Sequence, residues 1–144
     1  MAGSVPVPTL DQPYPGASFG TAVKRFFAKY ATFTGRASRS EFWWWFLANA
    51  IVASVLSSFA DIGGGATGAS GPTGLYISLN SVLGVWELAT LVPNLALAWR
   101  RLHDTNRAGP WWLLTLIPVV GWIIVIVLEA FPSDPQGARF DAAA

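Results

Sequence analysis

The densest group of side chains that could take part in acid–base or anion-binding chemistry is one short run. Residues 100–107 hold three arginines, the chain's one histidine and an aspartate: Arg100, Arg101, His103, Asp104 and Arg107. The planar guanidinium fork binds phosphate or carboxylate with two parallel hydrogen bonds. His103 and Asp104 are neighbours without an accompanying nucleophile, and Asp104 is equally explained as an ion-pair partner of Arg101 or Arg107. The run therefore predicts an anion-binding face, not a catalytic site.

A second basic group precedes the first apolar segment and carries the same chemistry. Together the two groups give the predicted binding residues: Arg36, Arg39, Arg100, Arg101, His103, Asp104 and Arg107. Their expected ligand is the phosphate of an anionic lipid or the carboxylate of a partner protein. The alternative is that part of this cluster only sets the orientation of a membrane protein.

Composition excludes several other functions. The chain has 144 residues, of which 53% are hydrophobic and 12% are charged, against about a quarter charged in soluble domains. It has no cysteine and one histidine, which leaves no thiol chemistry and little basis for a metal or haem site. The net charge of +1 gives no basic field for nucleic acid. We therefore expect no metal, cofactor or nucleic-acid partner.

The elements that must position the arginines are apolar segments of membrane-spanning length. Residues 42–60, 75–99 and 111–131 each approach the roughly 20 apolar residues that cross a bilayer, and a soluble helical core is the disfavoured alternative. Five basic residues precede the first segment, none separates the first two, three separate the last two and one follows. Basic loops stay in the cytoplasm. The sequence thus predicts an all-α, multi-pass protein of the cell membrane with three transmembrane helices, its N-terminus cytoplasmic and its C-terminus outside.

The flanking segments differ in composition. Residues 1–17 are rich in proline and predict a disordered tail, and residues 18–34 predict an amphipathic helix in the inner membrane interface. The alternative for that helix is packing against the protein's own cytoplasmic loop. The three-span domain covers residues 35–132, begins with a capping box formed by Ser38 and Glu41, and is followed by a short polar tail at 133–144.

A polar stripe runs along the second span. Asn80, Glu87 and Asn94 are spaced by seven residues, so they share one helix face, and Asn49 lies at nearly the depth of Glu87 in the first span. We expect this intramembrane network to act as structural glue, with a hydrogen bond between Asn49 and an uncharged Glu87. The alternative is a proton or ion pathway. Prolines at 93 and 118 predict kinks in the second and third spans.

Several of these motifs together resemble a known family. They are residues 33–43, the run from Arg100 to Asp104, the Trp111-Trp112 pair and residues 117–122. The chain resembles the bacterial membrane family called domain of unknown function 805 over residues 26–140. The resemblance implies an inner-membrane protein with a few spans and brings no established activity. Family members end in a Gly-x-Asn-x-aromatic-Gly pattern, of which this chain keeps Gly137 and Phe140 and lacks the asparagine and the last glycine.

Two functions follow as hypotheses. The favoured one is a non-enzymatic membrane module that binds membrane lipids, with anionic lipids as the candidates, or a partner protein, through its cytoplasmic arginine-rich face. Its further expected partners are a second copy of the chain or another membrane protein. The alternative is an oligomeric channel or small transporter that uses the polar stripe of the second span.

Overall fold

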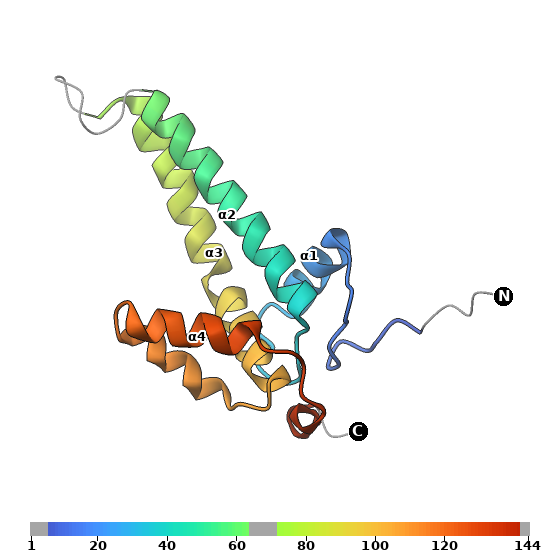
Figure 1. Ribbon diagram of the computed structural model, residues 1–144. Coiled ribbons are helices and arrows are strands. Elements are labelled where there is room, and N and C mark those ends of the chain that lie inside the picture. The colour runs from blue at the N-terminus through green and yellow to red at the C-terminus, as the bar shows by residue number, and fades with distance from the viewer. Residues whose placement is uncertain (1–5, 64–71, 142–144) are drawn as a thin grey trace. The chain divides into compact units, whose positions relative to one another are not determined.

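The computed structural model describes residues 6–63 and 72–141, and every regular element within them is a helix. The elements are α1 (Phe19–Ala28), α2 (Arg39–Ile62), α3 (Gly74–Asp104), the 3₁₀ helix η1 (Gly109–Leu116), α4 (Val120–Ala130) and the 3₁₀ helix η2 (Pro135–Phe140) (Figure 1). They form two compact units. The motif unit contains the described parts of Met1–Trp45 and Pro93–Ala144, and the two-helix unit contains those of Phe46–Val92. The predicted all-α class is confirmed for these residues.

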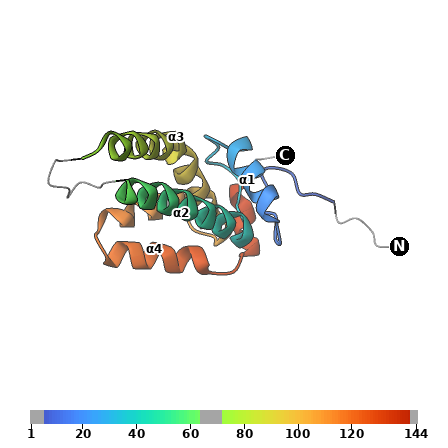
Figure 2. The same cartoon turned by 90° about the horizontal axis from the view of Figure 1, so that it is seen from above.

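The two-helix unit consists of parts of α2 and α3 that run side by side (Figures 1 and 2). The helices have 24 and 31 residues, so at about 1.5 Å per residue both exceed a ~30 Å hydrocarbon core. Both are apolar enough to cross a membrane, and few side chains of their most apolar stretches are buried. Ile51, Phe59, Val85 and Leu88 are each more than half exposed. Such exposure is typical of helices that face lipid and not of a soluble core.

Helix α1 is shorter than the predicted amphipathic helix of residues 18–34. Ser18 caps its first turn by accepting from the Thr21 amide at 3.3 Å. Its buried face packs against the start of α2, where the Phe26 ring stacks on Trp45 with 3.5 Å between centroids. Phe27 meets the same Trp45 ring edge-on, with 5.5 Å between centroids, and remains 47% exposed. Helix α1 therefore packs on the start of α2, while part of the Phe27 ring stays accessible.

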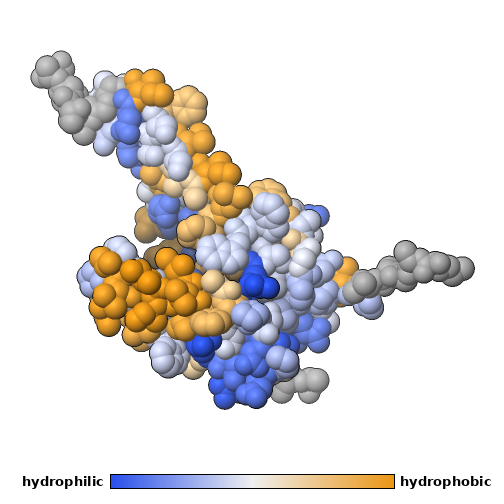
Figure 3. All heavy atoms as spheres, in the orientation of Figure 1, coloured by the Kyte–Doolittle hydropathy of each residue, from blue (hydrophilic) through white to orange (hydrophobic). Residues whose placement is uncertain are grey.

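The third predicted span, residues 111–131, is not one helix. The chain forms η1, breaks at residues 117–119 and returns as α4, which packs along η1 (Figure 2). Helix α4 has 11 residues, about half the number needed to cross a bilayer. The kink predicted at Pro118 is thus a reversal. Hydrophobic residues cover the visible face of α4 (Figure 3). Trp122, Ile123 and Ile126 of this helix are each more than half exposed.

Two backbone features fix this hairpin. At its base, Gly109 lies so close to the Trp99 ring that a Cβ atom would overlap the indole. At its tip, Val119 has φ +63° and the Val120 amide donates to the Pro118 carbonyl at 2.7 Å. A β-branched residue at positive φ is a genuine outlier, and this three-residue turn is a rare one. The reversal is therefore a tight, defined turn and not a loose loop.

The segments at the two chain ends are more ordered than predicted. Residues 1–5 and 142–144 of the predicted tails lie outside the described residues. Residues 6–17 have no regular structure, but their carbonyls at Pro8, Thr9 and Gln12 accept hydrogen bonds from Arg25. Residues 135–140 of the predicted polar tail form η2. Residues 6–17 of the predicted tail therefore contact the motif unit, because a buried arginine binds their backbone.

Candidate functional site

Arg101 and Asp104, from the last turn of α3, form the centre of the motif unit. Both side chains are fully buried and pair with each other. The Arg101 guanidinium also donates from Nε to the Glu129 carbonyl at 2.7 Å and from Nη2 to the Phe131 carbonyl. The Ser133 hydroxyl donates to Asp104 Oδ2. The pair thus holds the chain that leaves α4 against the end of α3.

Arg36 ties the C-terminal segment to the loop before α2. Its Nε and Nη2 atoms donate to the two Asp141 oxygens, each at 2.8 Å, and this bidentate pair raises the pKa of Arg36. Next to it, the Gly35 amide donates to the Phe140 carbonyl at 2.8 Å. His103 stacks on the Phe140 ring at 4.2 Å between centroids, and its Nδ1 atom lies 3.0 Å from the Gly35 carbonyl. His103 therefore acts as a packed core side chain.

Arg25 and Glu41 make a second buried ion pair, which the sequence analysis missed. Arg25 Nε lies 2.5 Å from Glu41 Oε1, and both side chains are almost inaccessible. The other Glu41 oxygen accepts from the amides of Ser38 and Tyr14 at 2.8 and 2.9 Å, while the Ser38 hydroxyl accepts from the Glu41 amide. The predicted capping box is thereby confirmed. Its glutamate has the additional task of neutralising a cation from α1.

Lys29 and Arg100 bring two more cations into this interior. Their side chains are 2% and 1% exposed. The Lys29 ammonium donates to the Arg36 carbonyl at 3.5 Å, and Arg100 Nε donates to the Ala96 carbonyl at 3.0 Å. Arg100 Nη2 is buried without a hydrogen-bond partner in the described part of the chain. Desolvation, with repulsion from Arg100, lowers the pKa of Lys29 to about 7.

Replacing Lys29 with methionine should stabilise the protein in a pH-dependent way. In the unfolded chain the lysine keeps its ordinary pKa of 10.5, so between about pH 7 and 10.5 the unfolded state binds more protons than the folded one. The free energy of unfolding of the wild type therefore rises with pH across this window. The methionine variant has no titrating group at this position, so its free energy of unfolding lacks this pH dependence. We expect the variant to be more stable at pH 6 by on the order of 1–2 kcal/mol, and the difference to shrink toward pH 10.

Thermal unfolding in detergent, followed by tryptophan fluorescence at several pH values, measures this difference. Lys24→Met is the matched control, because Lys24 is exposed on the same helix and should show little change at any pH. A Lys29→Met difference that stays constant from pH 6 to 10 would show that Lys29 is not desolvated.

The structure brings most of the predicted binding residues into one place, but it buries them. Arg36, Arg100, Arg101, His103 and Asp104 all lie in the motif unit and bind parts of the chain itself. Arg39 is exposed at the start of α2, and Arg107 is half-buried in the loop after α3. The basic residues that face outward in the motif unit are Lys24, Arg39, Arg107 and Arg139. Asp141 is the ion-pair partner of Arg36. The sequence placed it in a short polar tail and gave it no role in the site.

The residues of the predicted intramembrane network do not hydrogen-bond to one another in the described part of the chain. The Asn49 oxygen accepts from the Trp86 indole at 2.8 Å, and the expected Asn49–Glu87 hydrogen bond is not present among the described residues. Asn80 donates to the Tyr76 carbonyl on its own helix, and Glu87 is exposed. In the motif unit, Asn94 accepts from the Trp45 indole at 2.6 Å. The missed signal is tryptophan, whose N–H needs a partner wherever water is excluded.

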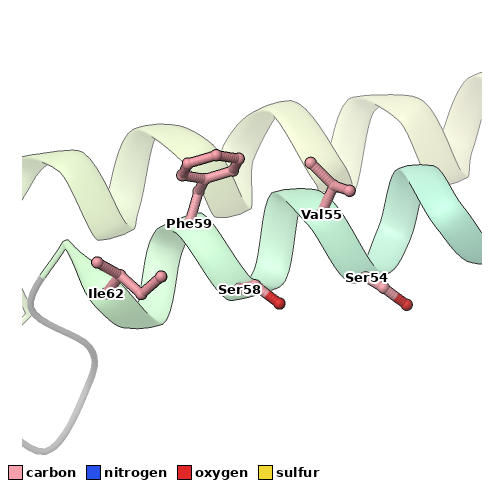
Figure 4. Close-up of a pocket in the computed structure, with 5 residues that line it drawn as sticks. All are labelled: Ser54, Val55, Ser58, Phe59 and Ile62. Atoms are coloured by element: carbon pink, nitrogen blue, oxygen red, sulfur yellow. The ribbon is translucent and has the colours of Figure 1, made fainter.

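Other regions offer less chemistry. A shallow hollow on α2 is lined by Ser54, Val55, Ser58, Phe59 and Ile62, with the two serine hydroxyls directed to one side (Figure 4). All five come from one helix and none is charged. Within the described ranges no three histidine, aspartate or glutamate residues are grouped so that they could hold a metal ion. The ionisable groups with defined geometry are therefore those of the motif unit.

Comparison with known proteins finds the same region in relatives. A family model described as a protein of unknown function (DUF805) matches residues 30–142. Inner membrane protein YhaI of Escherichia coli (strain K12) is 42% identical over 98 residues, which are 68% of this chain and 73% of YhaI. Inner membrane protein YhaH of the same organism is 36% identical over 111 residues, 77% of this chain and 85% of YhaH. No solved structure matches the chain.

Proposed function

The chain belongs to the DUF805 family of proteins of unknown function, and we propose that it is a non-enzymatic membrane module that binds anionic lipid through Lys24 and Arg39 of its motif unit. The observation that carries the proposal is that some basic side chains are paired inside the motif unit and others are exposed on it. Arg25, Arg36 and Arg101 are paired inside the unit. Lys24 and Arg39 face outward from α1 and the start of α2. The second group is exposed and therefore placed to meet phosphate.

Aromatic side chains next to these cations support a site at the membrane surface. Phe27 lies one helical turn after Lys24 and is 47% exposed, and Trp44, in the second turn of α2, is 41% exposed. A ring that is half buried in the headgroup region, beside a cation that reaches phosphate, is the usual arrangement of interfacial helices. The family relatives are named as inner membrane proteins, which agrees with such a location.

The proposal includes a topology with two spans, α2 and α3, and with both chain ends in the cytoplasm. Basic residues gather before α2 and after α3, which favours the cytoplasm for both of those helix ends. The η1–α4 hairpin begins at Gly109 beside Trp99 and ends where Arg101 binds the Glu129 and Phe131 carbonyls. A hairpin whose two ends meet at the same end of α3 enters the membrane without crossing it.

A channel or transporter along the α3 stripe has less support. The asparagine side chains of that stripe and of α2 are used in local contacts with Trp86, Tyr76 and Trp45. A proton path needs a series of polar groups that can exchange partners. We therefore assign these contacts to helix packing and keep lipid binding as the function.

The experiment compares two double variants of the purified protein with mixed lipids in native mass spectrometry. Lys24→Gln with Arg39→Gln removes both charges, and Lys24→Arg with Arg39→Lys keeps them. At about 1 kcal/mol per basic residue, the first should weaken binding of phosphatidylglycerol roughly tenfold or more, whereas the second should change it little. Equal retention of phosphatidylglycerol by both would contradict the proposal, as would an absence of salt dependence in the wild type.

A further inference from the structure

A polar pocket lies at the base of the hairpin, outside the buried ion pairs. One wall is the loop after α3, with Thr105 and Arg107, and the other is the segment after α4, with Phe131, Ser133 and Asp134. The walls are joined by backbone contacts, because the Asp134 amide donates to the Asp104 carbonyl at 2.8 Å. The pocket is therefore a fixed feature of the motif unit. It sits where the chain enters and leaves the apolar hairpin.

The cation of this pocket is the Arg107 guanidinium, and most of its N–H groups have no acceptor among the described residues. Arg107 Nη1 donates to the Thr105 carbonyl at 3.1 Å, which is the one hydrogen bond of the guanidinium within residues 6–63 and 72–141. The guanidinium also lies over the Phe131 ring, 5.1 Å from its centroid. This stacking holds the planar fork in one orientation while its remaining N–H groups stay available. A phosphate oxygen is the natural acceptor for them.

The anion of the pocket is held in a similar way. Asp134 Oδ1 accepts from the Gln136 amide at 2.8 Å, which leaves its second oxygen for another donor. The Ser133 hydroxyl is already directed to Asp104. Arg107 and Asp134 are the charged residues that line this pocket, one of each sign. A ligand that matches them must carry a negative and a positive group at the same time.

We propose that this pocket binds the headgroup of a phospholipid with a primary amine, of the phosphatidylethanolamine type, with the phosphate on Arg107 and the ammonium on Asp134. A primary ammonium can donate to the free carboxylate oxygen, whereas a choline headgroup has no N–H and is bound by open aromatic faces. Arg107 lies over one face of the Phe131 ring, and no second aromatic ring of the described residues lines this pocket. An anionic headgroup without an amine would leave Asp134 unmatched. The proposal rests on the proposed topology, which puts the base of the hairpin at headgroup depth.

Native mass spectrometry of the full chain with equal amounts of phosphatidylethanolamine, phosphatidylglycerol and phosphatidylcholine tests the site. We expect the wild type to retain phosphatidylethanolamine preferentially. Arg107→Gln should lower this retention roughly tenfold or more, as expected for loss of a hydrogen bond to a charged group. Asp134→Asn keeps a helix-capping side chain but removes the charge, so it should abolish the preference over phosphatidylglycerol while the protein stays folded. Arg139→Gln is the matched control and should behave as the wild type.

The outcomes separate this site from the general lipid-binding function. Equal retention of the three lipids by the wild type, or an undiminished preference in Asp134→Asn, overturns the pocket assignment. Loss of phosphatidylglycerol in the Lys24 and Arg39 variant concerns the proposed function alone and leaves the pocket untouched. A further arm adds soluble phosphoethanolamine. If phosphoethanolamine binds to lipid-free protein as tightly as phosphatidylethanolamine does, the ligand of the pocket is a free phosphoamine. The assignment of a lipid headgroup to the pocket is then wrong.

Discussion

Replacing Arg101 with leucine should destabilise the motif unit by about 3–5 kcal/mol, the usual effect of removing one partner of a buried ion pair. The Arg101 side chain is 0% exposed. It donates to carbonyls at Ala37, Glu129 and Phe131 as well as to Asp104. Leucine would leave these carbonyls and the Asp104 carboxylate buried without a donor. Most proteins have only about 5–15 kcal/mol of stability, so this loss should be visible as poor accumulation in the membrane.

Thermal unfolding in detergent and limited proteolysis of the C-terminal segment measure this effect. Arg101→Lys should fall between the wild type and the leucine variant, because lysine keeps the charge but cannot serve three elements at once. Arg139→Leu removes an exposed arginine and is the matched control, with an expected change within about 0.5 kcal/mol. If Arg101→Leu unfolds at the same temperature as Arg139→Leu, Arg101 does not hold the unit together.

The sequence was sufficient for the parts of the fold that depend on local patterns. The predicted spans 42–60 and 75–99 lie within α2 and α3, and Ser38 and Glu41 form the capping box. These features follow from helix length, apolar content and end signals that are contained in a few consecutive residues. Helix α3 was predicted too short because its last turn is charged. It continues to Asp104, and Arg101 and Asp104 pair within its last turn.

The third predicted span is not confirmed, because its residues form η1 and α4 and hydropathy does not distinguish a crossing from a reversal. Residues 111–131 are as apolar as a spanning helix, and Pro118 was interpreted as a kink. The reversal depends on the positive φ of Val119 and on the close approach of Gly109 to Trp99. A valine gives no warning of positive φ, and the fit of a glycine against a distant ring exists only in the folded chain.

The residues of the candidate site were predicted from the sequence, but their binding partners were not. The arginine run and Arg36 do come together, yet they bind Asp104 and Asp141 of the same chain. Nothing in the spacing of Arg36 and Asp141, which are 105 residues apart, indicates that they pair. A weak signal was present in the charges, because 8 acidic residues nearly balance 9 basic ones, although few of either are found in the apolar segments. Nearly equal numbers of acidic and basic residues are what pairing within the chain requires.

The central claim is that the arginine motifs build one unit to which the end of the chain returns on the cytoplasmic side. A hairpin that crosses the membrane would put η2 outside, as the three-span prediction did. In the structure the Gly35 amide binds the Phe140 carbonyl, and the Asp134 amide binds the Asp104 carbonyl. Residues before α2 and after α4 are therefore in direct contact, and a bilayer cannot separate them.

Single-cysteine labelling in intact cells tests this claim most directly, because the natural chain has no cysteine. Ala138, Lys24 and Asp61 are all exposed, so each can be changed to cysteine with little effect on the fold. With a membrane-impermeant maleimide, we expect Asp61→Cys to react in intact cells and Lys24→Cys to react only after lysis. The proposed topology predicts that Ala138→Cys behaves as Lys24→Cys does. Labelling of Ala138→Cys in intact cells, together with Asp61→Cys, would contradict it and restore the third span.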